Sequence, residues 1–293
     1  MYDIETLYEA DSVAHAITLL QEHRDALILA GGSDLLIQIR EGRLAGCVLV
    51  SIQKLDELRG ISMDREGTIR IGALTSFSHI TRDPIIHQYL GVLGEAVDMI
   101  GGPQIRNIGT IGGNVCNGVS SADSASTLMA YDAVMEYAGP QGIRSVPIED
   151  HYVQGGKTAL THDELLTAIR IPQECYEHCY GHYIKYAMRN AMDIAILGCS
   201  VNVRITQDKK RIERMRIAYG VAGPVPMRSS SAEAAVKGQR ICEKTIDLAG
   251  KAALHDMHPR SSWRASKELR LHLIEELAKR ALRRSIEIAG GTV

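Results

Sequence analysis

Short apolar stretches alternate along the chain with polar and glycine-containing turns, in the spacing expected of brief strands and helices. Near the start, Ser12 precedes an apolar pattern of helical period, which predicts a helix capped by that serine. Apolar runs over residues 26–30 and 48–52 predict two buried strands. Between them the chain passes through the turn Gly31-Gly32-Ser33-Asp34 into a further apolar stretch over 35–39.

The middle of the chain mixes strands and helices around a glycine-rich segment over residues 101–118. The pattern predicts a strand over 68–71 and helices over 76–81, 84–100 and 123–131. Strands over 133–138 and 143–147 are joined by Gly139-Pro140-Gln141-Gly142, a composition typical of a hairpin turn. An apolar stretch over 164–171 closes this half, and Pro172 marks the predicted boundary.

The second half of the chain begins with strands and ends with helices. Strands over 183–188, 197–205 and 212–221 predict a three-stranded antiparallel meander. Helices are predicted over 231–237, 242–256 and 266–289. Strands followed by helices indicate an α+β domain.

Composition limits the classes of function that the chain can serve. The 293 residues favour two domains, and 45% hydrophobic with 23% charged residues is ordinary for a globular protein. The net charge is −2, and no basic run is interleaved with aromatic residues, so we expect no nucleic-acid partner. The chain shows neither a signal peptide nor an apolar run of membrane-spanning length, which predicts a cytoplasmic protein that does not cross a membrane.

The six cysteines are scattered, and the nearest pair is Cys175 and Cys179. A metal site would need a second such pair, or histidines at ligand spacing. We therefore expect free thiols in a reducing cytoplasm and no metal site, with metal binding at this pair as the less favoured alternative.

The strongest local signal is the turn at Gly31-Gly32-Ser33-Asp34, where a strand ends in two glycines before a helix begins. Such a turn leaves backbone N–H groups free to bind an anion such as phosphate. Glycines also allow the backbone to approach a ligand closely. The alternative is an ordinary tight turn in which Ser33 or Asp34 caps the helix. Neither dinucleotide nor nucleotide-phosphate loop signatures match, which disfavours a Rossmann NAD site.

The second signal is the segment from Gly101 to Asn114, which holds five glycines in 14 residues. A flexible surface loop is the alternative, but isoleucines at 105, 108 and 111 argue against it. A buried, non-helical segment of this kind must find partners for its N–H groups, and a polar ligand would supply them. Two anion-friendly turns in one domain point to a diphosphate cofactor.

These residues resemble the paired FAD motifs of the molybdenum hydroxylase flavoproteins, which include the flavin subunits of xanthine dehydrogenase and carbon monoxide dehydrogenase. The two motifs are Ala30-Gly31-Gly32-Ser33-Asp34-Leu35 and Thr110-Ile111-Gly112-Gly113-Asn114. The likeness, closest to the bacterial xanthine dehydrogenase FAD-binding subunit, extends over essentially the whole chain. It includes residues 101–107, 114–118, 121–124, 185–189, 192–194 and 261–270.

The resemblance implies a two-lobed FAD-binding domain of the vanillyl-alcohol oxidase type, followed by a carbon monoxide dehydrogenase flavoprotein C-terminal domain. We expect the first domain over 1–176, with lobes of about 1–55 and 56–176. The α+β C-terminal domain would cover 177–293.

The resemblance also implies the residues of the FAD site. The first motif would bind the FAD diphosphate, and the second would form another backbone cradle for the cofactor. Asp123 would bond to a sugar or ribityl hydroxyl, and Lys185 would close the site from the second domain. Leu165 or Leu166 would lie against the adenine, and the 189–194 loop would bring Arg189 and Ile194 to the isoalloxazine. The implied FAD-binding residues are Leu29, Ala30, Gly31, Gly32, Ser33, Asp34, Leu35, Ile100, Ile105, Gly109, Thr110, Gly112, Gly113, Asn114, Cys116, Asp123, Leu165, Leu166, Lys185 and Ile194.

Several residues allow two interpretations. Some relatives have an aromatic residue where this chain has Ile100, which leaves open how the exposed flavin face is covered. Arg106 and Arg189 could stabilise a reduced flavin electrostatically, whereas Arg189 and Asp193 could simply pair across their loop. Trp263, the only tryptophan, is expected to pack the C-terminal domain, with a partner interface as the alternative.

The resemblance implies an oxidoreductase subunit of the xanthine dehydrogenase type. An iron–sulphur small subunit and a molybdopterin large subunit would be its partners, with electrons leaving to NAD or another soluble acceptor. Two alternatives stay open: a stand-alone flavin oxidoreductase of the vanillyl-alcohol oxidase group, and an FAD-binding assembly module without electron transfer of its own.

Overall fold

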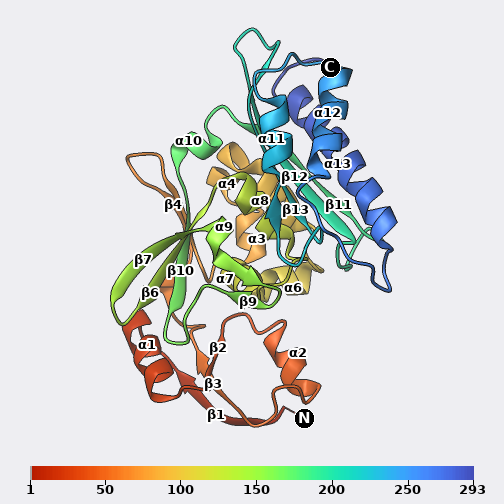
Figure 1. Cartoon of the computed structure of the whole chain (residues 1–293). Helices are drawn as coiled ribbons and strands as arrows, with labels where there is room; N and C mark the ends of the chain where they lie inside the picture. Colours follow the sequence, from red (N-terminus) through yellow and green to blue (C-terminus); the bar gives the residue numbers. More distant parts are fainter. Residues whose placement is uncertain (1) are drawn as a thin grey trace.

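The computed structural model describes residues 2–293 and shows three sheet-containing parts arranged in chain order (Figure 1). The N-terminal lobe lies at one end, a larger helix-covered lobe lies in the middle, and the C-terminal domain lies against that middle lobe. Helices and strands are mixed throughout, as the predicted α+β fold requires.

The first lobe is built on a parallel three-stranded sheet in the order β1–β3–β2. Its elements are β1 (Ile4–Glu9), α1 (Val13–Glu22), β2 (Leu27–Leu29), α2 (Leu35–Arg40) and β3 (Cys47–Ser51). The Ser12 side chain accepts a hydrogen bond from the His15 N–H at 3.1 Å, which confirms the predicted cap. The sequence pattern did not reveal β1, because one face of this edge strand is exposed and its apolar residues are few.

The second lobe holds an antiparallel five-stranded sheet in the order β4–β5–β10–β6–β7. The strands are β4 (Ile61–Met63), β5 (Ile69–Gly72), β6 (Val134–Gly139), β7 (Gly142–Pro147) and β10 (Leu165–Ile171). The predicted hairpin is present as β6 and β7. A short 3-10 helix η1 (Asp56–Leu58), a small hairpin of β8 (Tyr152–Gln154) and β9 (Lys157–Thr158), and helix α9 (Ile148–His151) lie in the connections.

Helices of the second lobe pack against this sheet around a core of aliphatic residues. They are α3 (Phe77–Ile80), α4 (Pro84–Tyr89), α5 (Gly91–Asp98), α6 (Pro103–Ile108), α7 (Ile111–Cys116) and α8 (Asp123–Ala130). The single helix predicted over 84–100 is therefore wrong. Leu90 leaves helical geometry with φ −126° and ψ 40° and separates α4 from α5.

The prediction that the glycine-rich segment is non-helical is also wrong, since α6 and α7 occupy most of it. Pro103 stands at the start of α6, where its fixed φ suits a first turn. The Thr110 side chain caps α7 by accepting from the Gly113 N–H at 3.1 Å. These two start signals outweigh the low helix propensity of the glycines.

The C-terminal domain follows the short helix α10 (Gln173–Tyr176) and contains the predicted antiparallel meander. Its strands are β11 (Tyr180–Tyr186), β12 (Leu197–Ile205) and β13 (Ile212–Gly220), and the two-residue β14 (Met227–Arg228) adds a fourth at the edge. The helices α11 (Ser230–Val236), α12 (Glu243–Ala253) and α13 (Lys267–Ile288) bury their apolar faces in one core with β12 and β13.

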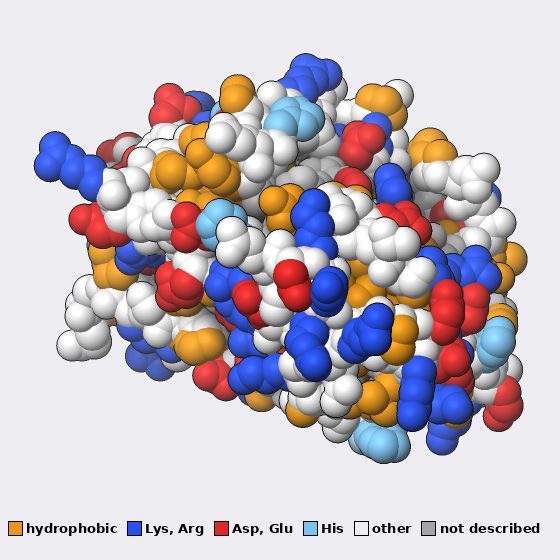
Figure 2. Space-filling view, turned by 90° about the horizontal axis from the view of Figure 1, so that it is seen from above, with side chains coloured by type: hydrophobic (Ala, Val, Ile, Leu, Met, Phe, Trp, Pro, Cys, Tyr) orange, Lys and Arg blue, Asp and Glu red, His pale blue; other side chains and the backbone are white. Residues whose placement is uncertain are grey.

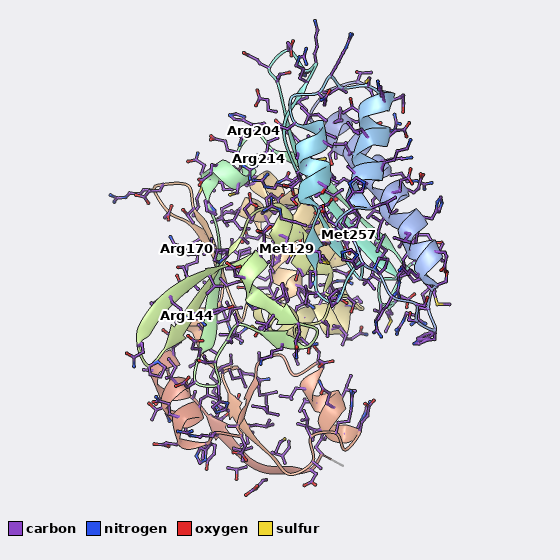
Figure 3. All side chains as sticks on the ribbon, viewed as in Figure 1. Met129, Arg144, Arg170, Arg204, Arg214 and Met257 are labelled. Atoms are coloured by element: carbon purple, nitrogen blue, oxygen red, sulfur yellow. The ribbon has the colours of Figure 1, made fainter. Side chains whose placement is uncertain are left out.

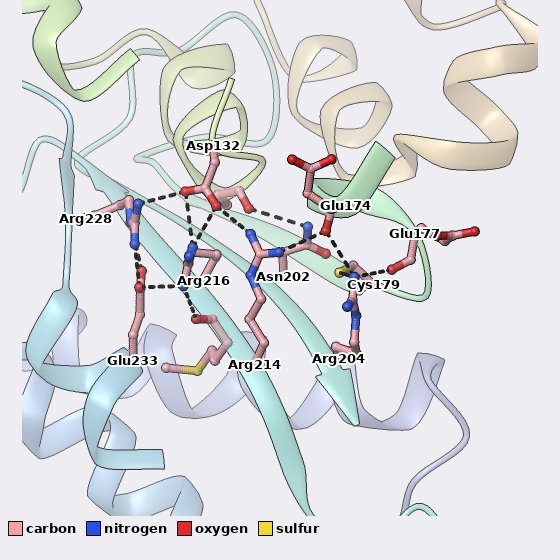
Figure 4. Close-up of polar contacts among 12 residues, drawn as sticks. Asp132, Glu174, Glu177, Cys179, Asn202, Arg204, Arg214, Arg216, Arg228 and Glu233 are labelled. Atoms are coloured by element: carbon pink, nitrogen blue, oxygen red, sulfur yellow. Dashed lines mark hydrogen bonds and ion pairs between the residues drawn. The ribbon is translucent and has the colours of Figure 1, made fainter. Parts of the chain in front are cut away.

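A cluster of charged residues joins the middle lobe to the C-terminal sheet (Figure 4). Asp132, in the turn after α8, accepts hydrogen bonds from the guanidinium groups of Arg214 at 2.5 Å, Arg216 at 2.9 Å and Arg228 at 2.7 Å. Glu233 accepts from Arg228 at 2.6 Å on the other side. Arg214 also donates to the Glu174 carbonyl at 2.9 Å, and Arg204 donates to the Glu177 carbonyl at 2.6 Å, so both arginines hold the segment that connects the two domains (Figure 3).

The described residues hold neither a helix suited to crossing a membrane nor a cluster of metal-binding side chains. None of the helices in residues 2–293 has the length and apolar character needed to cross a bilayer. Within the same residues, no three His, Cys, Asp or Glu side chains form a group that could hold a metal, and the cysteines are free. On the face seen in Figure 2, basic and acidic side chains are interspersed.

Candidate functional site

The first glycine turn connects β2 to α2 and presents a row of unused hydrogen-bond donors. Within residues 2–293, the N–H groups of the five consecutive residues 31–35 make no hydrogen bond, whereas Leu36 N–H already bonds to the Gly32 carbonyl at 3.0 Å. Gly32 has φ +73°, which favours glycine. Residues 31–33 and 35 are only partly buried, so a ligand can reach these donors.

The neighbouring side chains leave those donors free. Asp34 is the N-cap residue of α2, but its side chain makes no capping bond and instead accepts from Gln38 at 2.5 Å. The Ala30 carbonyl accepts from the Gln53 amide at 2.7 Å, and Leu29 is buried in the lobe core. The turn therefore offers main-chain donors to an anion, as its sequence predicts.

The second glycine segment uses its own donors within the protein, contrary to our expectation. Ile111 N–H bonds to the Thr75 carbonyl at 3.0 Å, and Gly112 N–H bonds to the Ala73 carbonyl at 2.9 Å. Gly113 N–H is taken by the Thr110 side chain. Because α7 docks on the loop after β5, these N–H groups do not need a ligand. Among residues 110–114, only the Thr110 N–H makes no hydrogen bond to a described residue.

The small size of the glycines is what the second segment requires. A Cβ placed on Gly112 would lie 2.7 Å from the Ala73 carbonyl oxygen. A Cβ on Gly109 would lie 2.9 Å from the Phe77 ring and 2.8 Å from the Ile105 carbonyl oxygen. These glycines bring α6 and α7 into close contact with the β5–α3 region.

The two glycine segments meet in the structure. A Cβ placed on Gly31 would lie 2.1 Å from the Ile108 carbonyl oxygen and 3.2 Å from the Gly109 Cα. The backbone of the first lobe therefore runs directly over the junction between α6 and α7. The free N–H groups of residues 31–35 therefore begin next to Gly109, so parts of both motifs lie close together.

A buried cluster joins α8 to β11 on the C-terminal side of the site. Asp123 is only 7% exposed, and its carboxylate accepts from the Lys185 Nζ at 2.8 Å and from the Tyr183 hydroxyl at 2.6 Å. Lys185 also donates to the Met99 carbonyl at 3.0 Å. Burial raises the pKa of the Asp123 carboxyl, and its contacts with Lys185 and Tyr183 oppose that rise.

Tyr183 was missed by the sequence reasoning. It lies two residues before Lys185 on the same face of β11, and this alternation is the signal that could have paired them. A Cβ on Gly198 of β12 would lie 2.8 Å from the Tyr183 hydroxyl, so that glycine makes room for it. A cofactor hydroxyl would share Asp123 with these two donors.

The 189–194 loop is organised by Asp193 rather than by a side-chain ion pair. The Asp193 carboxylate accepts from the backbone N–H groups of Met188 at 2.8 Å, Arg189 at 3.1 Å and Ile194 at 2.9 Å. The Arg189 guanidinium donates to the Met192 carbonyl at 2.6 Å. The alternative that Arg189 and Asp193 pair across their loop holds through the Arg189 main-chain N–H rather than its guanidinium. Met188, Met192 and Ile194 are exposed.

Other predicted residues lie around the same region with clear structural partners. Arg106 donates to the carbonyls of Ile100 at 3.1 Å and Gly101 at 3.2 Å, which gives it a structural role in the α5–α6 turn. Ile100 packs at the edge of the middle core, and Ile105 lies against Gly101. Asn114 accepts from the Ser124 hydroxyl at 2.7 Å.

Leu165 and Leu166 are buried, whereas Cys116 is only partly buried. Leu165 belongs to the core shared with the first lobe, whereas Leu166 belongs to the core of the second, so adjacent residues of β10 face different lobes. Burial raises the pKa of the Cys116 thiol to about 12, so this sulphur is protonated at neutral pH.

Trp263 does not pack the C-terminal domain, and that prediction is wrong. Its side chain is 79% exposed, and the Arg264 guanidinium lies over its ring at 4.2 Å from the centroid. The aliphatic residues of α12 and α13 fill the core without it.

Comparison with known families identifies this architecture. Residues 2–174 match the FAD binding domain in molybdopterin dehydrogenase, and residues 182–285 match the CO dehydrogenase flavoprotein C-terminal domain. The chain belongs to the FAD-binding subunits of the molybdenum hydroxylase family. Its cofactor is FAD, and the free donors of the first turn fit the diphosphate of that cofactor.

Individual relatives of this flavoprotein family cover nearly the whole chain. The xanthine dehydrogenase FAD-binding subunit of Escherichia coli O157:H7 is 42% identical over 99% of both chains. The carbon monoxide dehydrogenase medium chain of Hydrogenophaga pseudoflava is 30% identical, over 92% of this chain and 93% of that one. A solved structure of carbon monoxide dehydrogenase from Hydrogenophaga pseudoflava matches with a TM-score of 0.93 and 29% identity, covering 99% of both chains.

Proposed function

We propose that this chain is the FAD-binding, electron-transferring subunit of a molybdenum hydroxylase that acts on xanthine or a related purine. Its partners would be an iron–sulphur small subunit and a molybdopterin large subunit, and the acceptor would be NAD or another soluble oxidant. The similarity to a xanthine dehydrogenase FAD-binding subunit over 99% of both chains supports this assignment.

The observation that carries the proposal is the row of unused N–H groups over residues 31–35. The diphosphate of FAD would accept from these donors, and the Thr110 N–H would add one from the second motif. Asp123 and Lys185 would hold a hydroxyl-bearing part of the cofactor at the junction with the C-terminal domain. Ile100, Met192 and Ile194 would border the isoalloxazine.

The chain's own residues bind, orient and electrostatically adjust the cofactor rather than carrying out bond chemistry. When bound, the flavin supplies the redox chemistry that connects a two-electron acceptor with one-electron iron–sulphur donors. The positive charge of Arg189 is held at its loop by the Met192 carbonyl. A fixed positive charge there would stabilise negative charge on a reduced ring.

The test is anaerobic reduction of the purified, FAD-loaded chain. We expect NADH to bleach the visible flavin band, since NAD would have to dock directly over the ring in a chain of this fold. Reduction by a small alcohol or amine instead would indicate a stand-alone oxidoreductase, and no reduction by either would indicate an assembly module.

The identity of the complex needs a second experiment on the assembled protein. Co-purification of this chain with an iron–sulphur protein and a molybdoprotein, together with xanthine-dependent reduction of the flavin, is the expected result. A complex that reduces its flavin with another substrate but not with xanthine would contradict the purine assignment, while leaving FAD binding intact.

A further inference from the structure

Residues 258–267, called here the 258–267 loop, comprise most of the connection between α12 and α13 together with the first residue of α13. They expose the only tryptophan of the chain. Trp263 is 79% exposed, and one face of its ring is covered by Arg264. A large aromatic side chain left in water forgoes the free energy that burial would provide. Such residues are common where one protein contacts another.

The loop is held in one conformation by bonds to its own residues and to α13. Ser262 and Ala265 bond to each other through their backbones, at 2.9 Å and 3.3 Å. The Lys267 N–H donates to the Ser261 hydroxyl at 2.9 Å. From beneath, the Arg270 guanidinium donates to the Arg260 carbonyl and to the Ser262 hydroxyl. Trp263 is therefore presented on a preorganised loop, which lowers the entropic cost of binding.

The same loop and the first turn of α13 carry a cluster of positive charge that forms no ion pair with a described carboxylate. Arg260, Arg264 and Arg270 form no ion pair with any described residue, and neither does Lys267. Arg270 is only 3% exposed, and the Nε atoms of Arg264 and Arg270 are buried without a hydrogen-bond partner within residues 2–293. Uncompensated buried charge is costly, and a nearby negative charge would relieve that cost.

The loop lies at the end of the C-terminal sheet that carries the 189–194 loop. The Tyr219 hydroxyl donates to the Ile274 carbonyl at 3.0 Å, and Ser285 lies further along α13, 3.5 Å from the Val201 carbonyl oxygen. Tyr219 pairs with Cys199, near the start of β12. The first turn of α13 therefore projects past the start of β12, where β11 ends and the 189–194 loop begins (Figure 1).

We propose that the 258–267 loop is the docking surface for an acidic patch of the subunit that donates electrons to the flavin. A carboxylate of that subunit would face Arg260 and Arg264, and an apolar surface would cover Trp263. This inference rests on the proposed function, in which the 189–194 loop borders the isoalloxazine and the electron donor would approach from that end of the domain. A protein is favoured over a small ligand, since small ligands bind in concave sites and Trp263 protrudes.

The single tryptophan allows a direct test. The full chain, loaded with FAD and labelled with 5-fluorotryptophan, has one fluorine resonance, which is titrated with the purified, unlabelled iron–sulphur subunit. We expect a saturable shift of that resonance. We also expect Trp263→Ala to raise the dissociation constant by roughly tenfold or more, and Arg264→Gln to weaken binding less while reducing its salt dependence.

Matched controls separate this loop from the rest of the surface. Ile143→Ala removes an apolar side chain that is 72% exposed on β7, and Arg65→Gln removes an exposed charge next to β4. Both controls are expected to bind the subunit like the wild type. Circular dichroism and FAD content, expected to be unchanged in the four variants, exclude misfolding as the cause.

Each other outcome identifies what has failed. Binding with an unchanged fluorine resonance and wild-type affinity for Trp263→Ala would overturn the docking surface but leave the proposed function standing. No binding of the iron–sulphur subunit at all would overturn both. A shift caused by NAD or inorganic phosphate alone would assign the loop to a nucleotide or anion instead.

Discussion

The two glycine segments look alike in composition, yet they use glycine for different physical purposes. In the first turn, residues 31–35 leave five consecutive N–H groups without a protein acceptor. In the second, the N–H groups of residues 111–113 all have acceptors within the protein, and the glycines serve to let α7 pack against Ala73. The first turn is therefore suited to binding a ligand, whereas the second segment is suited to packing the helices next to that turn.

Glycine content therefore does not by itself identify a backbone site that binds an anion. What distinguishes the two segments is whether the backbone donors already have partners. The Gly31–Ile108 contact joins the two roles, because it places the donors of one segment over the packed helices of the other.

The largest expected effect comes from Gly31→Ala. The new Cβ would lie 2.1 Å from the Ile108 carbonyl oxygen, so the two segments would have to separate. Overpacking of this kind costs about 1–3 kcal/mol. If the whole cost falls on the FAD-bound state, it weakens FAD binding by a factor of about 5 to 150. Flavin fluorescence titration measures the change.

The control for this substitution is Gly91→Ala, where an added Cβ meets nothing within 4 Å. That variant is expected to bind FAD like the wild type. Wild-type affinity in Gly31→Ala would show that the two segments need not touch when the cofactor is bound.

Gly112→Ala is expected to have a smaller effect, which falls mainly on folding. Its Cβ would lie 2.7 Å from the Ala73 carbonyl oxygen, a milder clash than the 2.1 Å at Gly31. The displacement of α7 should lower the free energy of unfolding by about 1 kcal/mol, the low end of the cost of overpacking. Thermal unfolding without FAD measures this, again against Gly91→Ala. If Gly112→Ala left the stability of the FAD-free protein unchanged and reduced only FAD affinity, the division of roles would be incorrect.

The smallest expected effect is a pH dependence of folding stability, which arises at His151 next to α7. The His151 ring contacts the Tyr137 hydroxyl and the Val115 carbonyl of α7, and burial lowers the pKa of His151. Because the folded state disfavours the charged ring, stability is full above the ordinary pKa of 6.5 and is lost as the pH falls below it toward the lowered value.

Urea unfolding at several pH values checks this expectation. His151→Gln should flatten the loss of stability below pH 6.5, whereas His87→Gln, at an exposed position on α4, should not. If His151→Gln lost stability below pH 6.5 as steeply as the wild type, the buried histidine would not be the source of this pH dependence.

Much of the fold could be predicted from the sequence, because most elements carry one strong local signal. Ser12 caps α1, the 139–142 turn joins β6 and β7, and the meander of β11 to β13 follows its apolar alternation. The family resemblance supplied the cofactor and the two-domain arrangement, which periodicity alone could not.

The remaining features depend on contacts between distant residues. Nothing in the sequence near Gly112 indicates that the Ala73 carbonyl will accept its N–H. The sequence therefore could not predict that α7 is helical or that its N–H groups already have partners within the protein. Tyr183 was overlooked because its partner, Asp123, is 60 residues away. Trp263 was misplaced because a lone tryptophan usually packs in a core, and only the structure shows it outside.

The most direct test of the central claim is amide hydrogen exchange, resolved by residue, on the protein with and without FAD. The account predicts fast exchange at residues 31–35 without FAD and at least about tenfold slower exchange when FAD is bound, with residues 111–113 protected in both states. Equal exchange at residues 31–35 in the two states would contradict the claim that these main-chain donors hold the cofactor's diphosphate.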